Sequence, residues 1–137
     1  MGADPIPVLT KLSDSPHVIA SPAQDILGRK VTDRTGTDMG KVGDLVIDEN
    51  EQKVRFLILE HGGFLGIGEK ETYIPVDAVS DVTDDRVRID RTRDDVAHAP
   101  GYDPELLDQN EYYGSVYNHY GYTPFWGAGY VYPRFRP

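Results

Sequence analysis

The sequence contains no cysteine, only one tryptophan and no long apolar run. Without cysteine the chain can form neither disulfide bonds nor a thiolate nucleophile or metal ligand. No run approaches the roughly 20 apolar residues that span a bilayer, and the first residues lack the apolar core of a signal peptide. We therefore expect a cytoplasmic protein without a membrane anchor.

Basic residues are also scarce. Fourteen Lys and Arg residues stand against 23 Asp and Glu residues, which gives a formal net charge of −9. The imbalance is concentrated in residues 25–90, which carry 9 basic and 15 acidic residues. Phosphate backbones attract basic surfaces and repel acidic ones, so we do not expect direct binding to nucleic acid.

The composition divides the chain into three regions. Residues 1–24 hold four prolines and predict an extended N-terminal lead, with one short strand at 17–20. Residues 25–90 consist of short β-rich runs separated by turn residues, a pattern typical of a small, mostly antiparallel β-barrel. Residues 91–137 predict a helical segment and then an irregular Tyr/Gly/Pro-rich extension. The expected strands are Lys30–Asp33, Lys41–Asp48, Lys53–Glu60, Thr72–Ile74, Ser80–Thr83 and Arg86–Asp90.

Two of these strands have unusual patterns. Gly43 interrupts the alternation of Lys41–Asp48 and predicts a β-bulge. The strand Lys53–Glu60 is apolar on both faces, whereas a barrel interior can bury only one of them. We therefore expect the other face, including Phe56 and Ile58, to meet either the C-terminal helix or a second subunit in a homodimer.

The densest glycine cluster lies in the segment HGGFLGIGEK, residues 61–70. Glu69 stands where a P-loop would place its phosphate-binding lysine, and Glu71 stands where a dinucleotide-binding fingerprint would place its third glycine. An extended segment follows instead of a helix, so no helix N-terminus faces the loop. We interpret these glycines as backbone requirements of a wide hairpin, whose apolar residues pack or lie at an interface.

The C-terminal region begins with helix signals. Thr92 is a good N-cap for a short helix, Arg93–Ala97, with Asp95 at the capping-box position. Asp103-Pro104 is a favourable start for a second helix, on which Tyr113 and Tyr117 share a face. The tyrosines beyond these either dock on the barrel or form an adhesive surface like an interface hot spot, and the sequence leaves both interpretations open.

Three elements recur at fixed spacing across the barrel region: Gly28-x-x-Val31-x-Asp33-x-x-Gly36, Gly40-x-Val42-x-Asp44 and Tyr73-x-Pro75-Val76. This spacing resembles the PRC-barrel family, which includes the photosynthetic reaction-centre H subunit and a ribosome maturation factor. The tail, with Pro100-x-Tyr102-x-Pro104, resembles those of bacterial stress-response members. The resemblance implies a small β-barrel used for assembly and protein interaction, with no shared catalytic residues.

Motifs for catalysis or metal binding do not emerge. Asp48-x-Asn50-x-Gln52 imitates the start of a calcium loop, but Lys53 and Leu59 occupy the positions of its glycine and bidentate glutamate. The four histidines have no helical metal-ligand spacing. We expect no enzyme, no metal and no cofactor.

Our sequence-based hypothesis is a non-enzymatic, stress-response-type module that interacts with another protein or assembles with itself. The alternatives are an RNA-processing or ribosome-associated binder, and a barrel that binds a small molecule or metal. The candidate interaction residues are Phe56, Ile58, Phe64, Leu65, Ile67, Tyr120, Tyr122, Phe125, Trp126, Tyr130 and Tyr132.

Overall fold

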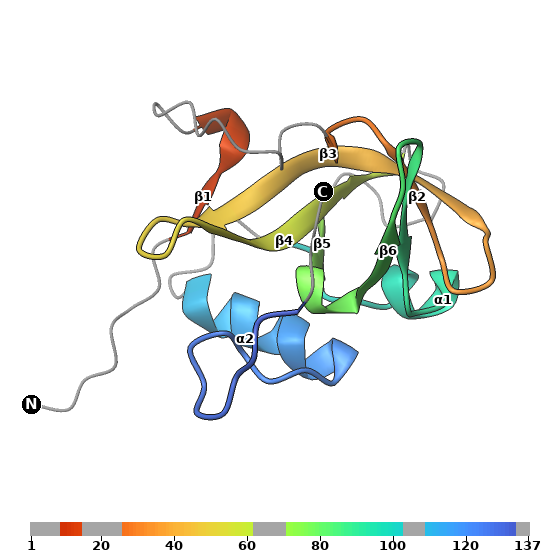
Figure 1. Cartoon of the computed structure of the whole chain (residues 1–137). Helices are drawn as coiled ribbons and strands as arrows, with labels where there is room; N and C mark the ends of the chain where they lie inside the picture. The colour runs from red at the N-terminus through yellow and green to blue at the C-terminus, as the bar shows by residue number, and fades with distance from the viewer. Residues whose placement is uncertain (1–8, 15–25, 62–70, 103–108, 134–137) are drawn as a thin grey trace, which may run out of the picture.

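The computed structural model describes residues 9–14, 26–61, 71–102 and 109–133. These residues form a strongly curved seven-stranded sheet, with one helix at its end and another across its outer face (Figure 1). The strand order along the sheet is β5-β4-β3-β2-β7-β6, and β1 pairs with β3 beside this path. The prediction of a mainly β fold with a short helical and irregular aromatic extension is confirmed.

Six expected strands are present with small shifts of their ends. The strands are β1 (Leu9–Lys11), β2 (Lys30–Thr32), β3 (Asp38–Asp48), β4 (Lys53–Glu60), β5 (Thr72–Pro75), β6 (Val79–Val82) and β7 (Arg86–Ile89). Short 3-10 turns occupy Leu12–Asp14 and Val76–Ala78. Strand β1 lies in the N-terminal lead and was not predicted, whereas the strand expected at 17–20 lies outside the described residues.

Strand β3 organises the sheet because it pairs with three others. Its first residues pair with β2, its last residues pair with β1, and β4 runs antiparallel along most of its length. The register with β4 shifts between Val42 and Asp44, which confirms the bulge expected at Gly43. Gly40 has a φ of +129°, and a Cβ there would lie 2.2 Å from the carbonyl oxygen of Glu60. Only glycine lets the two strands approach so closely.

The turn between β2 and β3 is built around Asp33, which is buried. Its Oδ1 accepts hydrogen bonds from the amides of Thr35 (2.8 Å) and Thr37 (2.9 Å), and its Oδ2 accepts one from the amide of Arg93 (3.0 Å). Burial alone would raise the pKa of Asp33, but the bonds from the Thr35 side chain and these amides lower it below its ordinary value. Asp33 therefore fixes the turn and ties it to the start of helix α1.

Helix α1 (Arg93–Ala97) is capped as predicted, because the Thr92 side chain accepts a hydrogen bond from the amide of Asp95. Helix α2 (Gln109–Tyr120) lies below β4 and β5 in Figure 1. Residues 121–133 then continue without helix or strand, as expected. The predicted N-cap of the second helix, Asp103, lies outside the described residues.

Candidate protein-interaction site

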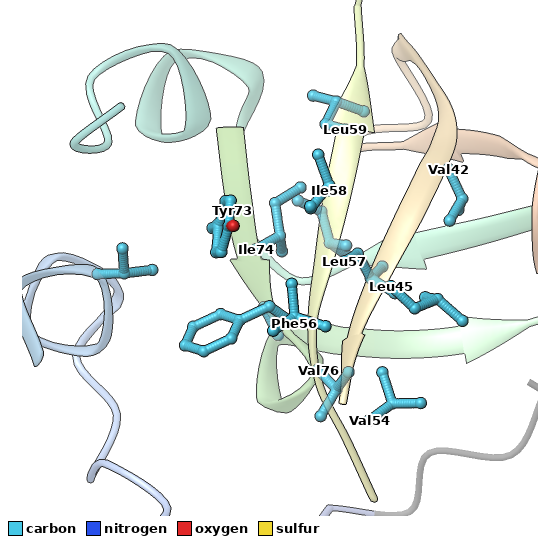
Figure 2. Close-up of a cluster of buried hydrophobic side chains, with 14 of the residues drawn as sticks. Val42, Leu45, Val54, Phe56, Leu57, Ile58, Leu59, Tyr73, Ile74 and Val76 are labelled. Atoms are coloured by element: carbon cyan, nitrogen blue, oxygen red, sulfur yellow. The ribbon is translucent and has the colours of Figure 1, made fainter. Parts of the chain in front are cut away.

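The outer face of β4 is covered by helix α2 of the same chain. Phe56 is 0% exposed, and its ring centre lies 5.1 Å from that of Tyr117 and 5.7 Å from that of Tyr113. Figure 2 shows Phe56 and Tyr73 on the side that faces α2, while Val42 and Leu45 lie on the other side of the sheet. The two-faced strand thus has a barrel core on one side and an aromatic core on the other. The sequence predicted that either the C-terminal helix or a second subunit would cover this second face of β4. In the structure, helix α2 covers it.

This aromatic core is a cluster of tyrosines from three segments. Tyr73 of β5 stacks on Tyr102 at 5.1 Å and meets the edge of Tyr112 at 5.5 Å. The Tyr112 hydroxyl donates a hydrogen bond to the carbonyl of Pro100 (3.0 Å). Burial raises the pKa of the Tyr73, Tyr112 and Tyr113 phenols, to about 12 for Tyr113. These hydroxyls therefore stay neutral and the cluster behaves as an apolar core.

Arg55 lies on the same side as this core because β4 bulges there. Val46 pairs with Phe56 and Ile47 pairs with Val54, so Arg55 has no partner of its own in β3. A bulge changes the alternation of side chains locally, which lets Arg55 and Phe56 both reach the C-terminal region. Without this bulge, strict alternation would send Arg55 into the barrel core.

The Arg55 guanidinium is buried and paired. The residue is only 2% exposed, and its Nη2 lies 3.0 Å from Oδ2 of Asp48 and 2.9 Å from Oε2 of Glu51. Burial alone would lower the pKa of Arg55, but its bond to Asp48 raises it. Asp48 also accepts a hydrogen bond from the amide of Asn50, so the motif that imitated a calcium loop is a turn whose aspartate serves Arg55.

We define the aromatic tail as residues 122–133. Its rings contact three cations of the barrel region. The Arg55 guanidinium lies 4.3 Å from the ring centre of Phe125, and Arg91 lies 4.7 Å from that of Tyr122. Lys53 lies 5.0 Å from the ring centre of Tyr132. Such contacts contribute about 0.5–2 kcal/mol each, more when desolvated.

Further contacts strengthen this docking around β4. Tyr132 and Tyr130 lie 5.4 and 5.8 Å from the Arg55 guanidinium. The Tyr132 hydroxyl donates a hydrogen bond to the carbonyl of Val54 (3.0 Å). The Trp126 ring meets the edge of Tyr117 at 5.8 Å. The tail therefore docks on its own barrel, centred on Arg55.

Four buried polar atoms around Arg55 make no hydrogen bond of good geometry among the described residues. They are Arg55 Nε, Asp77 Oδ1, Tyr117 OH and Tyr130 OH. Burial raises the pKa of Asp77, although interactions with Tyr130 and Arg55 oppose the shift. An unsatisfied buried polar group costs about 1–3 kcal/mol. The junction between tail and barrel thus combines favourable ring contacts with unfavourable desolvation.

The tail also has an outward side. Val131 is 81% exposed and follows Tyr130, whereas Phe125, Trp126 and Tyr132 are partly buried against the core. The other large apolar residue exposed among the described residues is Leu27, at 41%. The outer side of the tail therefore presents Val131 among aromatic residues whose inner sides are docked.

The structure brings together only some of the predicted interaction residues. Tyr122, Phe125, Trp126, Tyr130 and Tyr132 meet in the tail. Phe56, Ile58 and Tyr120 are buried within this chain. Phe56 packs against Tyr113 and Tyr117 of helix α2, which is one of the two contacts expected for it. Phe64, Leu65 and Ile67 lie outside the described residues.

Arg55, Asp48 and Asp77 were not predicted as site residues. One signal for Arg55 was available, since it is the one charge between the charged end residues of a strand that is otherwise apolar on both faces. Such a charge needs a partner when it is buried. Nothing in the local pattern pointed to Asp77, which depends on the position of the tail.

The comparison with protein families gives one match. The model of the PRC-barrel domain matches residues 20–96, more than half of the chain. The match covers the described strands β2 to β7 and most of α1, and it ends before α2 and the tail. No curated protein matches the chain.

Two other kinds of site are absent from the described residues. Within them, no three or more His, Asp or Glu side chains gather as metal ligands would. Neither helix α1 nor α2 has the length and apolar character that crossing a membrane requires.

Proposed function

Because the chain belongs to the PRC-barrel domain family, we propose that it is a non-enzymatic module of the stress-response type, which binds another protein or assembles with itself in the cytoplasm. The observation that carries this proposal is the aromatic tail, which is anchored on Arg55 and exposes Val131. Aromatic residues and arginine are enriched at interface hot spots, so the tail has the composition of a contact surface.

The anchoring matters for binding. A segment that is already held in place loses little conformational freedom when a partner docks, so less of the binding free energy is spent on ordering it. Rings fixed by Arg55, Arg91 and Lys53 are therefore better contacts than the same rings on an unstructured chain. We propose a homodimer as the simplest assembled form, because two-fold symmetry is the commonest arrangement of soluble homo-oligomers.

The test compares two exposed apolar positions. Val131→Asp places a charge on the outer side of the tail, and Leu27→Asp places the same charge outside the tail. Cross-linking in the source cells, followed by native mass determination, should give a complex that Val131→Asp removes and Leu27→Asp keeps. Both variants should melt at the temperature of the unmodified chain. Equal loss in the two variants, or no complex with the unmodified chain, would contradict the proposal.

One observation bears on the RNA-binding alternative. Lys30 of β2 lies directly opposite Lys41 of β3 and Arg86 of β7, which makes a row of three cations across the sheet. A depression of about 440 Å³ lies beside this row. However, Lys30 lies 3.6 Å from Asp38 and Lys41 lies 3.9 Å from Glu60, so carboxylates largely balance the row. The protein-interaction proposal is the stronger one.

A further inference from the structure

The aromatic tail is held to the rest of the chain by side chains. Among the described residues, the backbone hydrogen bonds that begin and end within it join Gly127 to Pro124 and Tyr130 to Gly127. Its contacts with β4 are the rings around Arg55 and Lys53 and the hydroxyl of Tyr132. No backbone ladder fixes the tail to the sheet, so it can leave without disrupting any strand.

The docked position carries a specific cost. Arg55 Nε, Tyr117 OH, Tyr130 OH and Asp77 Oδ1 are buried at the junction, and among the described residues none of them makes a hydrogen bond of good geometry. When the tail leaves, water can reach these atoms, and their desolvation cost disappears. Opening the tail loses the free energy of the ring contacts, but hydration of these polar atoms recovers part of it. The tail should therefore open more readily than its number of ring contacts would suggest.

A hinge lies at the start of the tail. Helix α2 ends in a Schellman motif, in which the Tyr122 amide donates to the Tyr117 carbonyl (3.0 Å) and the Gly121 amide donates to the Asn118 carbonyl (3.2 Å). Gly121 has a φ of +82°, a conformation that glycine adopts without strain. Rotation at Gly121 would move the tail while Val116 and Tyr117 keep α2 packed on the barrel.

We infer that the tail exchanges between two copies of the chain, so that each tail docks on Arg55 of the other copy. This inference rests on the self-assembly part of the proposed function. The occupant must match three cations at the spacing of Arg91, Arg55 and Lys53, and the tail of this chain already does so. Reciprocal exchange remakes every contact in a closed two-fold dimer. The tail is joined to its own barrel by a short connection, which gives it a high effective concentration for docking within the same chain. Docking on a second copy competes with this only when the protein concentration is high, so the exchanged dimer forms at high protein concentration.

The absence of native cysteine allows a direct test. Lys53→Cys marks the barrel beside Tyr132, and Val131→Cys marks an exposed position on the tail. The two single-cysteine chains, one of them carrying a mass tag, are mixed at high concentration and treated with a short thiol–thiol cross-linker. The matched control replaces Lys53→Cys with Lys30→Cys, which is exposed on β2. We expect several-fold more tagged–untagged heterodimer from the Lys53 and Val131 pair than from the control pair.

A second arm tests the cost at the junction. Asp77→Asn removes the carboxylate charge that faces Tyr130, Tyr117 and Tyr122 of the C-terminal region and Arg55 of β4. We expect this change to slow heterodimer formation, because the desolvation cost of the docked tail is then smaller and the tail opens less often.

Equal cross-linking of the test and control pairs would overturn the exchange, as would a native mass that stays monomeric at every concentration. If the exchange is overturned in either way and Val131→Asp still abolishes a complex with another protein, the proposed function stands without the exchange.

Discussion

The rings of Phe56 and Tyr117 lie 5.1 Å apart, and this contact joins the barrel to its C-terminal helix. Phe56→Ala should lower the free energy of unfolding by about 3–5 kcal/mol, because it removes a fully buried ring between two packed elements. Urea unfolding followed by circular dichroism measures this loss. Val131→Ala, at an exposed position, should change the free energy by less than about 0.5 kcal/mol. Equal effects of the two changes would contradict the docked helix.

Tyr117 and Tyr112 provide a matched pair for the buried hydroxyls. The Tyr117 hydroxyl makes no hydrogen bond of good geometry among the described residues, whereas the Tyr112 hydroxyl donates to the Pro100 carbonyl. Tyr117→Phe should therefore leave the stability unchanged or raise it, and Tyr112→Phe should lower it by about 1 kcal/mol. Thermal melts of both variants test the difference. A larger loss for Tyr117→Phe would mean that its hydroxyl is satisfied in solution.

Alkaline pH should unfold the chain through its tyrosines. Burial raises the pKa of Tyr113 and of Tyr132 to about 12, above the ordinary value of 10.0. A folded-state pKa above the unfolded value means that stability is fully present below about pH 10 and is lost as the pH rises toward 12. Tyrosinate absorbance and near-ultraviolet circular dichroism should change together in one cooperative transition. Gradual ionisation with intact tertiary signal would contradict the burial of the cluster.

Asp33 should control stability on the acid side. Its folded-state pKa lies below its ordinary value of 3.8, so its contribution is present above about pH 3.8 and is lost as the pH falls through the folded-state pKa. Asp33→Asn should lower stability at neutral pH by about 1–3 kcal/mol, because its NH₂ replaces one of the two oxygens and cannot accept the bonds made there, either those from the Thr35 and Thr37 amides or that from the Arg93 amide. It should also make the melting temperature depend less on pH at acid pH, because the titrating carboxylate is gone. Asp81→Asn, at an exposed position on β6, is the control and should change neither.

Labelled single-stranded RNA should not bind at physiological salt. The cation row at Lys30, Lys41 and Arg86 is balanced by Asp38 and Glu60, and the whole chain carries −9. Fluorescence anisotropy of the labelled RNA measures binding, and a basic RNA-binding protein of similar size serves as the positive control. Saturable binding that Lys30→Glu abolishes would revive the RNA-binding alternative.

Local sequence patterns predicted the strands well because the pattern of apolar residues in each strand can be recognised within that strand alone. The run KVRFLILE became β4 with the expected ends, and the Gly43 bulge followed from broken alternation. The two apolar faces of β4 also required a cover, and helix α2 provides it. These properties depend on near neighbours, which is why the residues alone revealed them.

The functional surface was only partly predictable because it depends on distant contacts. Arg91, for example, donates a hydrogen bond to the Tyr120 carbonyl and lies over the Tyr122 ring, and the sequence pattern around the two tyrosines gives no sign of this contact. The role of Arg55 required the second register shift in β4, which has no glycine or proline to mark it. Strand β1 was missed because three residues are too few for a period, and its pairing partner lies more than thirty residues away.

The parallel pairing of β2 with β7 determines the order in which parts of the fold can form during translation. Lys30 pairs with Arg86, so the barrel cannot close until β7 has left the ribosome, whereas the β3–β4 hairpin can form much earlier. Pairings between distant residues are slow because loop-closure entropy must be overcome first. Helix α2 and the tail emerge after β7, onto a sheet that is then complete. The nascent chain therefore exposes the Phe56 face of β4 from the moment that the hairpin forms, and helix α2, which is made later, is the segment that removes this face from water.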